Sequence, residues 1–211
     1  MGLFGKNKEK ASSSKSSAGR SGGHHGQSAG PSTGATGEQY RSVFLLTYKS
    51  ATFKSHWALF VPHAQDRSCK TGRKIHAIGN VQEGFEIEII RNYDLTLTRT
   101  KPLTPIELGI VSTQYLVEVA EDFQYGIDTT ARDAFEDLIL SVPAPSKSLN
   151  KVQDNPGGRA GPPRRVTLSD CQWWLTRVVE KLVEYGYLIP PTRGLNKGKN
   201  PVEILANAPR H

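Results

Sequence analysis

Apolar residues in the first folded part of the chain follow the spacing of β-strands. Short runs rich in β-branched and aromatic residues, bounded by turn-forming residues, are typical of strands. Runs of this kind lie at residues 43–48, 56–61, 74–79 and 85–90, with shorter candidates at 95–97 and 106–111. Within 85–90 apolar and acidic residues alternate, which indicates a strand with one buried face. The pattern therefore predicts a small sheet.

Helical spacing replaces this pattern further along the chain. Apolar residues between 116 and 123 recur at helix spacing behind two possible hydroxyl caps at 112–113, and a second helix is predicted over 131–140. The strongest helical pattern runs from Cys171 to about Tyr185 and ends at Gly186. Strands followed by helices, without regular alternation, predict an α+β fold in which a small antiparallel sheet packs against helices.

Composition divides the 211 residues into one domain and flanking segments. Residues 1–38 are rich in Ser, Gly and Lys and are expected to form a disordered tail. The domain is expected over 39–190, with a flexible basic loop rich in Pro and Gly at 142–166, and 191–211 form a C-terminal extension.

The net charge of +7 is concentrated outside the predicted sheet, because residues 39–142 hold eleven Lys and Arg against thirteen Asp and Glu. A nucleic-acid-binding surface needs basic residues gathered on a folded face, so no such partner is expected.

Cysteine usage and hydropathy indicate the compartment. Cys69 and Cys171 are too few for a disulfide framework, and no apolar run is long enough to cross a bilayer. We therefore expect a cytoplasmic protein. Gly2 and the lysines of the N-terminal tail leave open an attachment to a membrane surface.

Cys171 is the leading candidate for chemistry. It opens the third helix behind Asp170, where unpaired N–H groups and the helix dipole favour a thiolate. A histidine on a rigid strand is the usual base for such a thiol. His56 begins one predicted strand, and His76 lies in another and could orient His56 or replace it as the base. The competing interpretation is structural: Cys171 lies on the apolar face of its helix, and free cysteine packs as a small hydrophobe.

The tryptophans are candidates for substrate contacts. Trp173 falls on the polar face of its helix, where a large aromatic ring needs a loop or a ligand to cover it, whereas Trp174 borders the apolar face and is expected in the core. Trp57, next to His56, is the second candidate for a substrate contact. The cysteines and histidines lack the paired spacing of a zinc site, so no metal or cofactor is expected. Cys69 is expected to be an exposed loop thiol.

Three motifs carry a resemblance to a known fold: "HWALFV" at 56–61, "KIHAIGN" at 74–80 and "CQWWL" at 171–175. Their order resembles the permuted papain-like fold of the lecithin–retinol acyltransferase group and related permuted thiol peptidases, over roughly residues 40–188. The combination also resembles a family of small uncharacterised fungal proteins.

The resemblance to the acyltransferase group implies residue roles. His56 would be the base, His76 or else Asn80 the orienting group, and Cys171 the nucleophile. Asp170 stands where that group has an asparagine, and its carboxylate should raise the pKa of the thiol. The expected function is a cysteine-dependent hydrolase or acyltransferase acting on an ester, thioester or amide bond of an acyl or peptide substrate. The alternative is a non-catalytic interaction module on the same fold, with Cys171 buried in the core.

Overall fold

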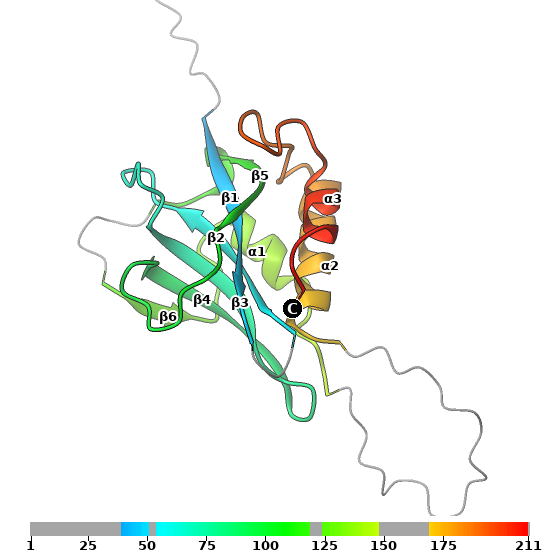
Figure 1. Cartoon of the computed structure of the whole chain (residues 1–211). Helices are drawn as coiled ribbons and strands as arrows, with labels where there is room; N and C mark the ends of the chain where they lie inside the picture. The colour runs from blue at the N-terminus through cyan, green and yellow to red at the C-terminus, as the bar shows by residue number, and fades with distance from the viewer. Residues whose placement is uncertain (1–38, 51–53, 119–123, 148–168, 211) are drawn as a thin grey trace, which may run out of the picture. The chain divides into compact units, whose positions relative to one another are not determined.

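A computed structural model describes residues 39–50, 54–118, 124–147 and 169–210 (Figure 1). The predicted tail at 1–38 lies outside the described residues, as does most of the predicted loop at 142–166.

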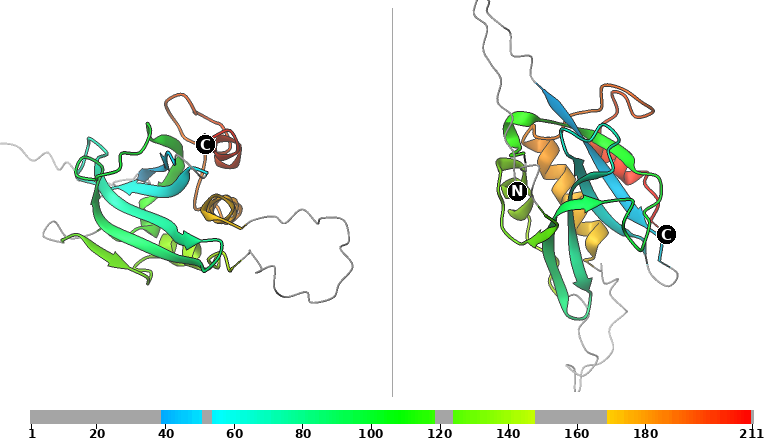
Figure 2. Two further views of the ribbon diagram at one scale, coloured as in Figure 1. Left: turned by 60° about the horizontal axis from the view of Figure 1, so that its bottom comes forward. Right: turned by 90° about the vertical axis from the view of Figure 1, so that its left-hand side faces the viewer.

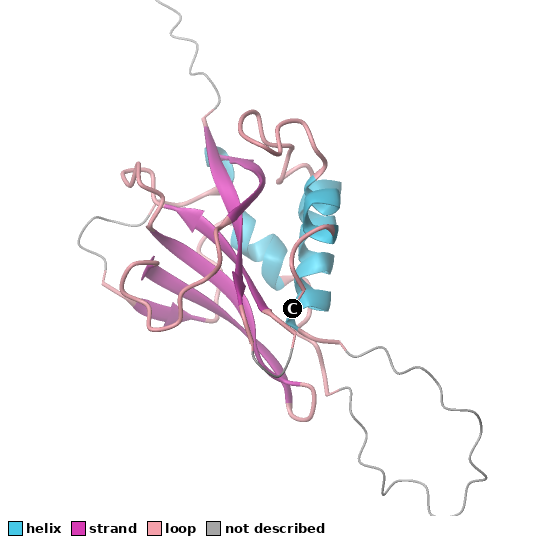
Figure 3. Ribbon diagram, in the orientation of Figure 1, coloured by secondary structure: helices cyan, strands magenta, loops and turns pink. Residues whose placement is uncertain are grey.

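Six strands form one sheet in the order β5-β1-β2-β3-β4-β6, and every neighbouring pair is antiparallel (Figures 1 and 3). The strands are β1 (Tyr40–Tyr48), β2 (His56–Pro62), β3 (Thr71–Asn80), β4 (Gly84–Asp94), β5 (Ile106–Ser112) and β6 (Gly126–Asp128). The strands predicted at 43–48, 56–61, 74–79, 85–90 and 106–111 are all confirmed, and each extends beyond its predicted bounds.

Residues 95–97 form a turn rather than the predicted short strand. The carboxylate of Asp94 accepts hydrogen bonds from the backbone N–H and the hydroxyl of Thr96, both at 2.6 Å. An aspartate that bonds the chain two residues ahead stabilises a turn, and this local bond outweighs the β-propensity of the segment.

The helices of the described residues are α1 (Ala134–Leu140), α2 (Cys171–Glu184) and α3 (Pro201–Ala206), and a 3₁₀ turn lies at Thr113–Tyr115. Helix α2 begins and ends as predicted. Asp170 caps it by accepting a hydrogen bond from the N–H of Trp173 at 2.9 Å, and Gly186 follows it with a φ of 72°. The predicted second helix is confirmed as α1, which begins three residues later than expected.

The prediction of a helix at 116–123 is wrong for residues 116–118, which are the part of this segment that the structure describes. Leu116 has already left the 3₁₀ turn with extended backbone angles. The N–H of Val117 then donates to Asp133 at 3.0 Å, and its carbonyl accepts from Arg73 at 2.7 Å. Because these side chains satisfy the backbone groups that a helix would use, the segment stays extended.

Helix α3 lies in the stretch that the sequence marks only as an extension. Asn200 caps it by accepting from the N–H of Val202 at 2.8 Å, and Pro201 occupies its first turn. Ile204 and Leu205 bury their side chains in the core of the sheet and helices, so this segment belongs to the domain.

The helices lie on one side of the sheet, with α2 and α3 next to each other (Figures 1 and 2). Trp174 and the other buried residues of α2 pack against the side chains of Trp57, Leu59 and Val61 from β2. The opposite face carries a smaller cluster that includes Ala58 and Phe60, and no described helix contributes to it. The two faces of β2 therefore have different environments, and alternate residues face alternate sides.

A buried network of ion pairs ties α1 to the sheet. The carboxylate of Glu136 on α1 accepts from Arg73 on β3 at 2.5 Å and from Arg91 on β4 at 2.8 Å. Arg91 also pairs with Asp128 on β6 at 2.9 Å, and Arg73 pairs with Asp133, the cap of α1. The network joins three strands and a helix, and its central carboxylate is fully buried.

Candidate functional site

His56 and His76 meet on the face of the sheet that lies away from α2. The Nε2 atom of His56 lies 2.8 Å from the Nδ1 atom of His76, with the two rings edge to face. His56 stands opposite Tyr48 across the β1–β2 pair, with 5.9 Å between ring centroids. The sequence suggested that His76 could orient His56, and the structure brings these two residues into hydrogen-bond contact.

The contacts of His76 constrain how the pair is protonated. Its Nε2 atom is buried without a hydrogen bond, although the carboxylate of Glu88 lies 3.4 Å away. A neutral imidazole has one donor and one acceptor nitrogen, so the 2.8 Å contact requires one ring to donate. If the N–H of His76 points toward Glu88, His56 donates to His76 and keeps the lone pair on its own Nδ1 atom.

Burial governs the ionisation of this face. Burial, together with the smaller effect of the charge of Lys74, lowers the pKa of His56 to about 4 and that of His76 to about 3. Burial also lowers the pKa of Lys74 to about 8, opposed by the negative charge of Glu88. At pH 7 both imidazoles are therefore neutral, whereas Lys74 is mostly protonated.

These side chains line a pocket of about 390 Å³, called the histidine pocket below. Its walls are Tyr48, Lys49, Ser50, His56, Lys74, His76, Tyr93, Thr98 and Thr100. The Nζ atom of Lys74 lies 4.9 Å and 4.8 Å from the ring centroids of Tyr48 and Tyr93, whose hydroxyls are 3.0 Å apart. A concave site with aromatic walls and several titratable groups of shifted pKa has the features of a ligand site.

Cys171 lies on the other side of the sheet. Its side chain is partly buried against the main core, and the backbone N–H of Trp57 interacts with its sulfur. The side chain of Trp57 points into that core, so the neighbouring His56 points to the opposite face. Among the described residues no hydrogen bond joins Cys171 to a histidine. The structure thus brings His56 and His76 together and does not bring Cys171 to either of them.

The pKa of the Cys171 thiol is raised, not lowered. Burial is the main cause, and the charge of Asp170 adds to it as the sequence predicts. The N–H groups at the start of α2 act in the opposite direction, as expected for a helix N-terminus, but burial outweighs them. This thiol is therefore mainly protonated at neutral pH.

The comparisons with known proteins identify a family. Residues 43–189 match a family of unknown function, DUF6540. The chain belongs to this family. No curated protein and no solved structure matches the chain. The DUF6540 region contains His56, His76 and Cys171, and it ends before α3.

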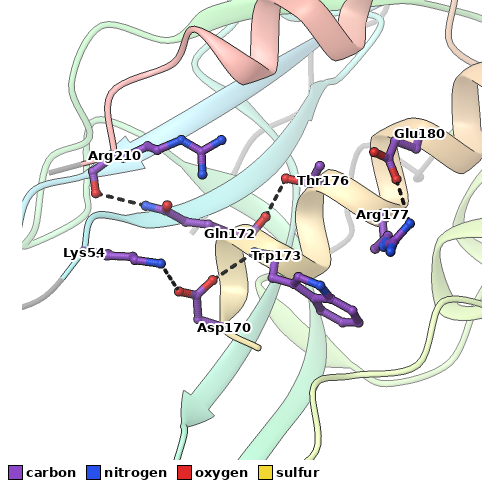
Figure 4. A pocket seen from close by; sticks show the side chains of 8 residues that line it. All are labelled: Lys54, Asp170, Gln172, Trp173, Thr176, Arg177, Glu180 and Arg210. Carbon is purple, nitrogen blue, oxygen red and sulfur yellow. Dashed lines mark hydrogen bonds and ion pairs between the residues drawn. The ribbon is translucent and has the colours of Figure 1, made fainter. Parts of the chain in front are cut away.

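A second pocket of the DUF6540 chain, of about 400 Å³, lies beside the first turns of α2 (Figure 4). It is called the helix-start pocket below, and its lining residues are Lys54, Asp170, Gln172, Trp173, Thr176, Arg177, Glu180 and Arg210. Its charges are largely paired within the pocket, Lys54 with Asp170 at 2.9 Å and Arg177 with Glu180 at 3.3 Å. Trp173 lies in this pocket beneath the guanidinium of Arg177, at 5.8 Å from the ring centroid.

The two tryptophans expected to contact a substrate have different positions. Trp173 lines a pocket and is partly accessible, as expected from its place on the polar face. Trp57 is fully buried, donates from its indole N–H to the carbonyl of Pro209 at 3.0 Å, and has no surface to offer a substrate. Trp174 is buried in the core, as predicted, and Cys69 is exposed, as predicted.

Lys74, Tyr48 and Tyr93 are site residues that the sequence analysis missed. A signal was present for Lys74, because residues two apart in a strand share a face and Lys74 precedes His76 by two. Tyr48 and Tyr93 could not be placed without the strand order, since they come from β1 and β4. No group of three or more metal-ligating side chains forms among the residues that the structure describes.

The lowered pKa values of the histidines predict a pH-dependent stability. An unfolded histidine has a pKa near 6.5, so between pH 6.5 and 4 the unfolded DUF6540 chain binds more protons than the folded one. The stability that the two neutral histidines contribute is fully present above pH 6.5 and is lost as the pH falls toward 4. We expect the free energy of unfolding to fall by about 3–4 kcal/mol from pH 7.5 to pH 5, about 2 kcal/mol for each histidine.

Urea unfolding at a series of pH values measures this loss. The double variant His56→Gln, His76→Gln should show a distinctly smaller loss over the same range. An equal loss in the variant would mean that other groups cause it.

Proposed function

We propose that this DUF6540 protein is a non-catalytic binding module in which Cys171 has a structural role and the histidine pocket holds the ligand. The observation that carries the proposal is the placement of Cys171 and the two imidazoles on opposite faces of the sheet. A thiol nucleophile needs a base within about 3 Å of the proton that it gives up. Cys171 has no such base among the described residues, and burial keeps its thiol protonated.

The histidine pocket supports the binding role. Its walls come from three neighbouring strands, β1 to β3, together with Tyr93 of β4 and the loop that follows it. Side chains held on paired strands are positioned before a ligand arrives, which reduces the entropy lost on binding.

The permuted papain-like fold is our proposal for the finer classification. It is supported by the order of the elements, in which two strands bearing histidines precede the helix that opens with Cys171. It is also supported by the packing of α2 on β2 and β3. The position of the histidines on the face away from α2 is where this chain departs from an active thiol enzyme of that fold.

A cysteine-dependent hydrolase or acyltransferase is the competing proposal. The contact between His56 and His76 favours it, because the acyltransferase resemblance implies a base held by a second polar residue. This activity would require the imidazole of His56 to reach the sulfur of Cys171 past the backbone of β2.

Two observations bear on the compartment. Cys69 and Cys171 are free, and none of the described helices has the length and apolar character needed to cross a membrane. Free thiols persist in reducing compartments, and on this basis we propose a cytoplasmic location.

Labelling with a cysteine-directed activity probe distinguishes the binding module from the hydrolase. We expect Cys171 to react no faster than a small-molecule thiol with the same probe, and His56→Ala to leave that rate unchanged. The measurement uses the Cys69→Ser background, so that Cys171 is the remaining cysteine, and mass spectrometry follows the labelling. Rapid labelling that His56→Ala abolishes would establish the thiol enzyme and overturn the binding module.

A further inference from the structure

We infer that the histidine pocket binds a small metabolite through an oxyanion, a carboxylate or a phosphate, with Lys74 as the cationic anchor. This inference rests on the proposed function, since it names the ligand class for the same pocket. It is carried by the surroundings of Lys74 and by the charge balance of the pocket walls.

Lys74 is a buried cation without an anionic partner at contact distance. The residue is only 7% exposed, and its Nζ atom lies over the rings of Tyr48 and Tyr93. No hydrogen bond or salt bridge holds this ammonium group in the described part of the chain, and Glu88 acts on it only electrostatically. The ammonium group faces the pocket and contacts ring faces, which are weaker partners than an oxygen acceptor. An oxyanion in the pocket would supply the missing acceptors.

The walls of the pocket carry positive charge without a compensating acid. The lining residues include Lys49 and Lys74 and no aspartate or glutamate. Glu88 lies beside His76 but is not among the lining residues. A cationic ligand would meet two like charges here, whereas an anionic ligand would be attracted, so the charge balance selects an anion.

Neutral donors surround the position of the cation. Thr100 and the hydroxyls of Tyr48 and Tyr93 come from different strands and loops of the pocket wall. The Tyr48 and Tyr93 hydroxyls share one hydrogen bond, so one of them and the hydroxyl of Thr100 can each donate a hydrogen bond to an oxygen atom of a ligand. Charge-assisted hydrogen bonds of this kind are about twice as strong as neutral ones, and they fix the orientation of a bound oxyanion.

The size and the aromatic walls indicate the rest of the ligand. A volume of about 390 Å³ is at the small end of ligand pockets and suits a metabolite rather than a protein segment. The rings of Tyr48 and Tyr93 offer an apolar surface beside Lys74, which favours a ligand with a flat or apolar body attached to its anionic group.

Binding of two probes tests this inference. Phenyl phosphate and benzoate share the apolar ring and differ in the oxyanion, so their relative affinities distinguish a phosphate site from a carboxylate site. We expect saturable shifts of the His56 and His76 ring signals in NMR titrations of the full chain with at least one of them. Benzylamine, which has the same ring and a positive charge, should cause no saturable shift.

The matched variants are Lys74→Met and Lys54→Met. Lys74→Met removes the charge and keeps the apolar stem, and it should weaken binding about 30-fold or more. Lys54→Met changes a lysine of the helix-start pocket and should leave the affinity unchanged.

If Lys74→Met does not fold, comparing benzylamine with the two anions on the wild-type protein still decides whether the pocket prefers a negative or a positive ligand. No saturable shift with either anion, or equal affinities of the two variants, would overturn the inference. The labelling of Cys171 is a separate measurement, so failure of the ligand class and failure of the binding module can be told apart.

Discussion

Glu136→Ala is expected to lower the free energy of unfolding by about 3–5 kcal/mol. The carboxylate of Glu136 is fully buried and bonds both Arg73 and Arg91, which are themselves almost fully buried. It also accepts from the backbone N–H of Arg132 at 2.9 Å. Removing it leaves two buried guanidinium groups without their central partner, and an uncompensated buried charge is far costlier than a lost surface pair. Urea unfolding followed by circular dichroism measures the change.

Glu180→Ala is the matched control for this prediction. Glu180 pairs with Arg177 on the polar side of α2, where the side chains of Arg177 and Glu180 are 59% and 43% exposed. An exposed pair of this kind contributes less than about 1 kcal/mol. Similar losses for the two variants would contradict a dominant role for the buried network.

Trp174→Ala is expected to destabilise the protein by about 3–5 kcal/mol. The side chain is fully buried between α2 and the sheet, and its indole N–H donates to the carbonyl of Val142 at 3.1 Å. The substitution removes this apolar area, opens a cavity in the core, and leaves the buried carbonyl of Val142 without its partner. Thermal and urea unfolding of the variant give the magnitude.

Trp173→Ala provides the comparison one residue away on the same helix. Its ring lines the helix-start pocket and is partly exposed (Figure 4). We expect a loss at least about 2 kcal/mol smaller than that of Trp174→Ala, because less area leaves the core and water can fill the space. An equal loss of unfolding free energy in the two variants would contradict the structure, in which Trp174 is buried in the core and Trp173 is partly exposed.

Local sequence signals account for strands β1 to β5 and for α2, whereas β6 was not predicted. The strands in the first half carry dense runs of β-branched and aromatic residues, and α2 has both an apolar face and capping residues at each end. In these elements the preference of each residue agrees with the final packing, which is where sequence reasoning is strongest.

The segment after β5 shows where local signals fail. Leu116 and the apolar residues behind it have helix spacing, but Asp133 and Arg73 reach this segment from α1 and β3 and bond its backbone. Partners so distant in sequence cannot be found from the spacing alone. Helix α3 is too short to show a clear period, although Asn200 followed by Pro201 is a typical helix start.

The sequence predicts the residues of the candidate site only in part, because it does not show which face of β2 is covered by α2. Strand alternation puts His56 and Trp57 on opposite faces, and the sequence shows this directly. Both faces of β2 are apolar, with Leu59 on one and Phe60 on the other, so the pattern does not reveal which face α2 covers. That choice decides whether Cys171 meets an imidazole, and it is fixed by the packing of the whole sheet.

The pH profile of the Cys171 labelling rate tests the central claim most directly, because the rate reports the thiolate fraction. With His56 on the far face of the sheet, the rate should rise only at alkaline pH, with an apparent pKa above that of an ordinary cysteine thiol. The profile of His56→Ala should be superimposable on that of the wild type. An apparent pKa near or below 7 that returns to the alkaline range in His56→Ala would contradict the account, because it would mean that the imidazole and the thiol share a proton.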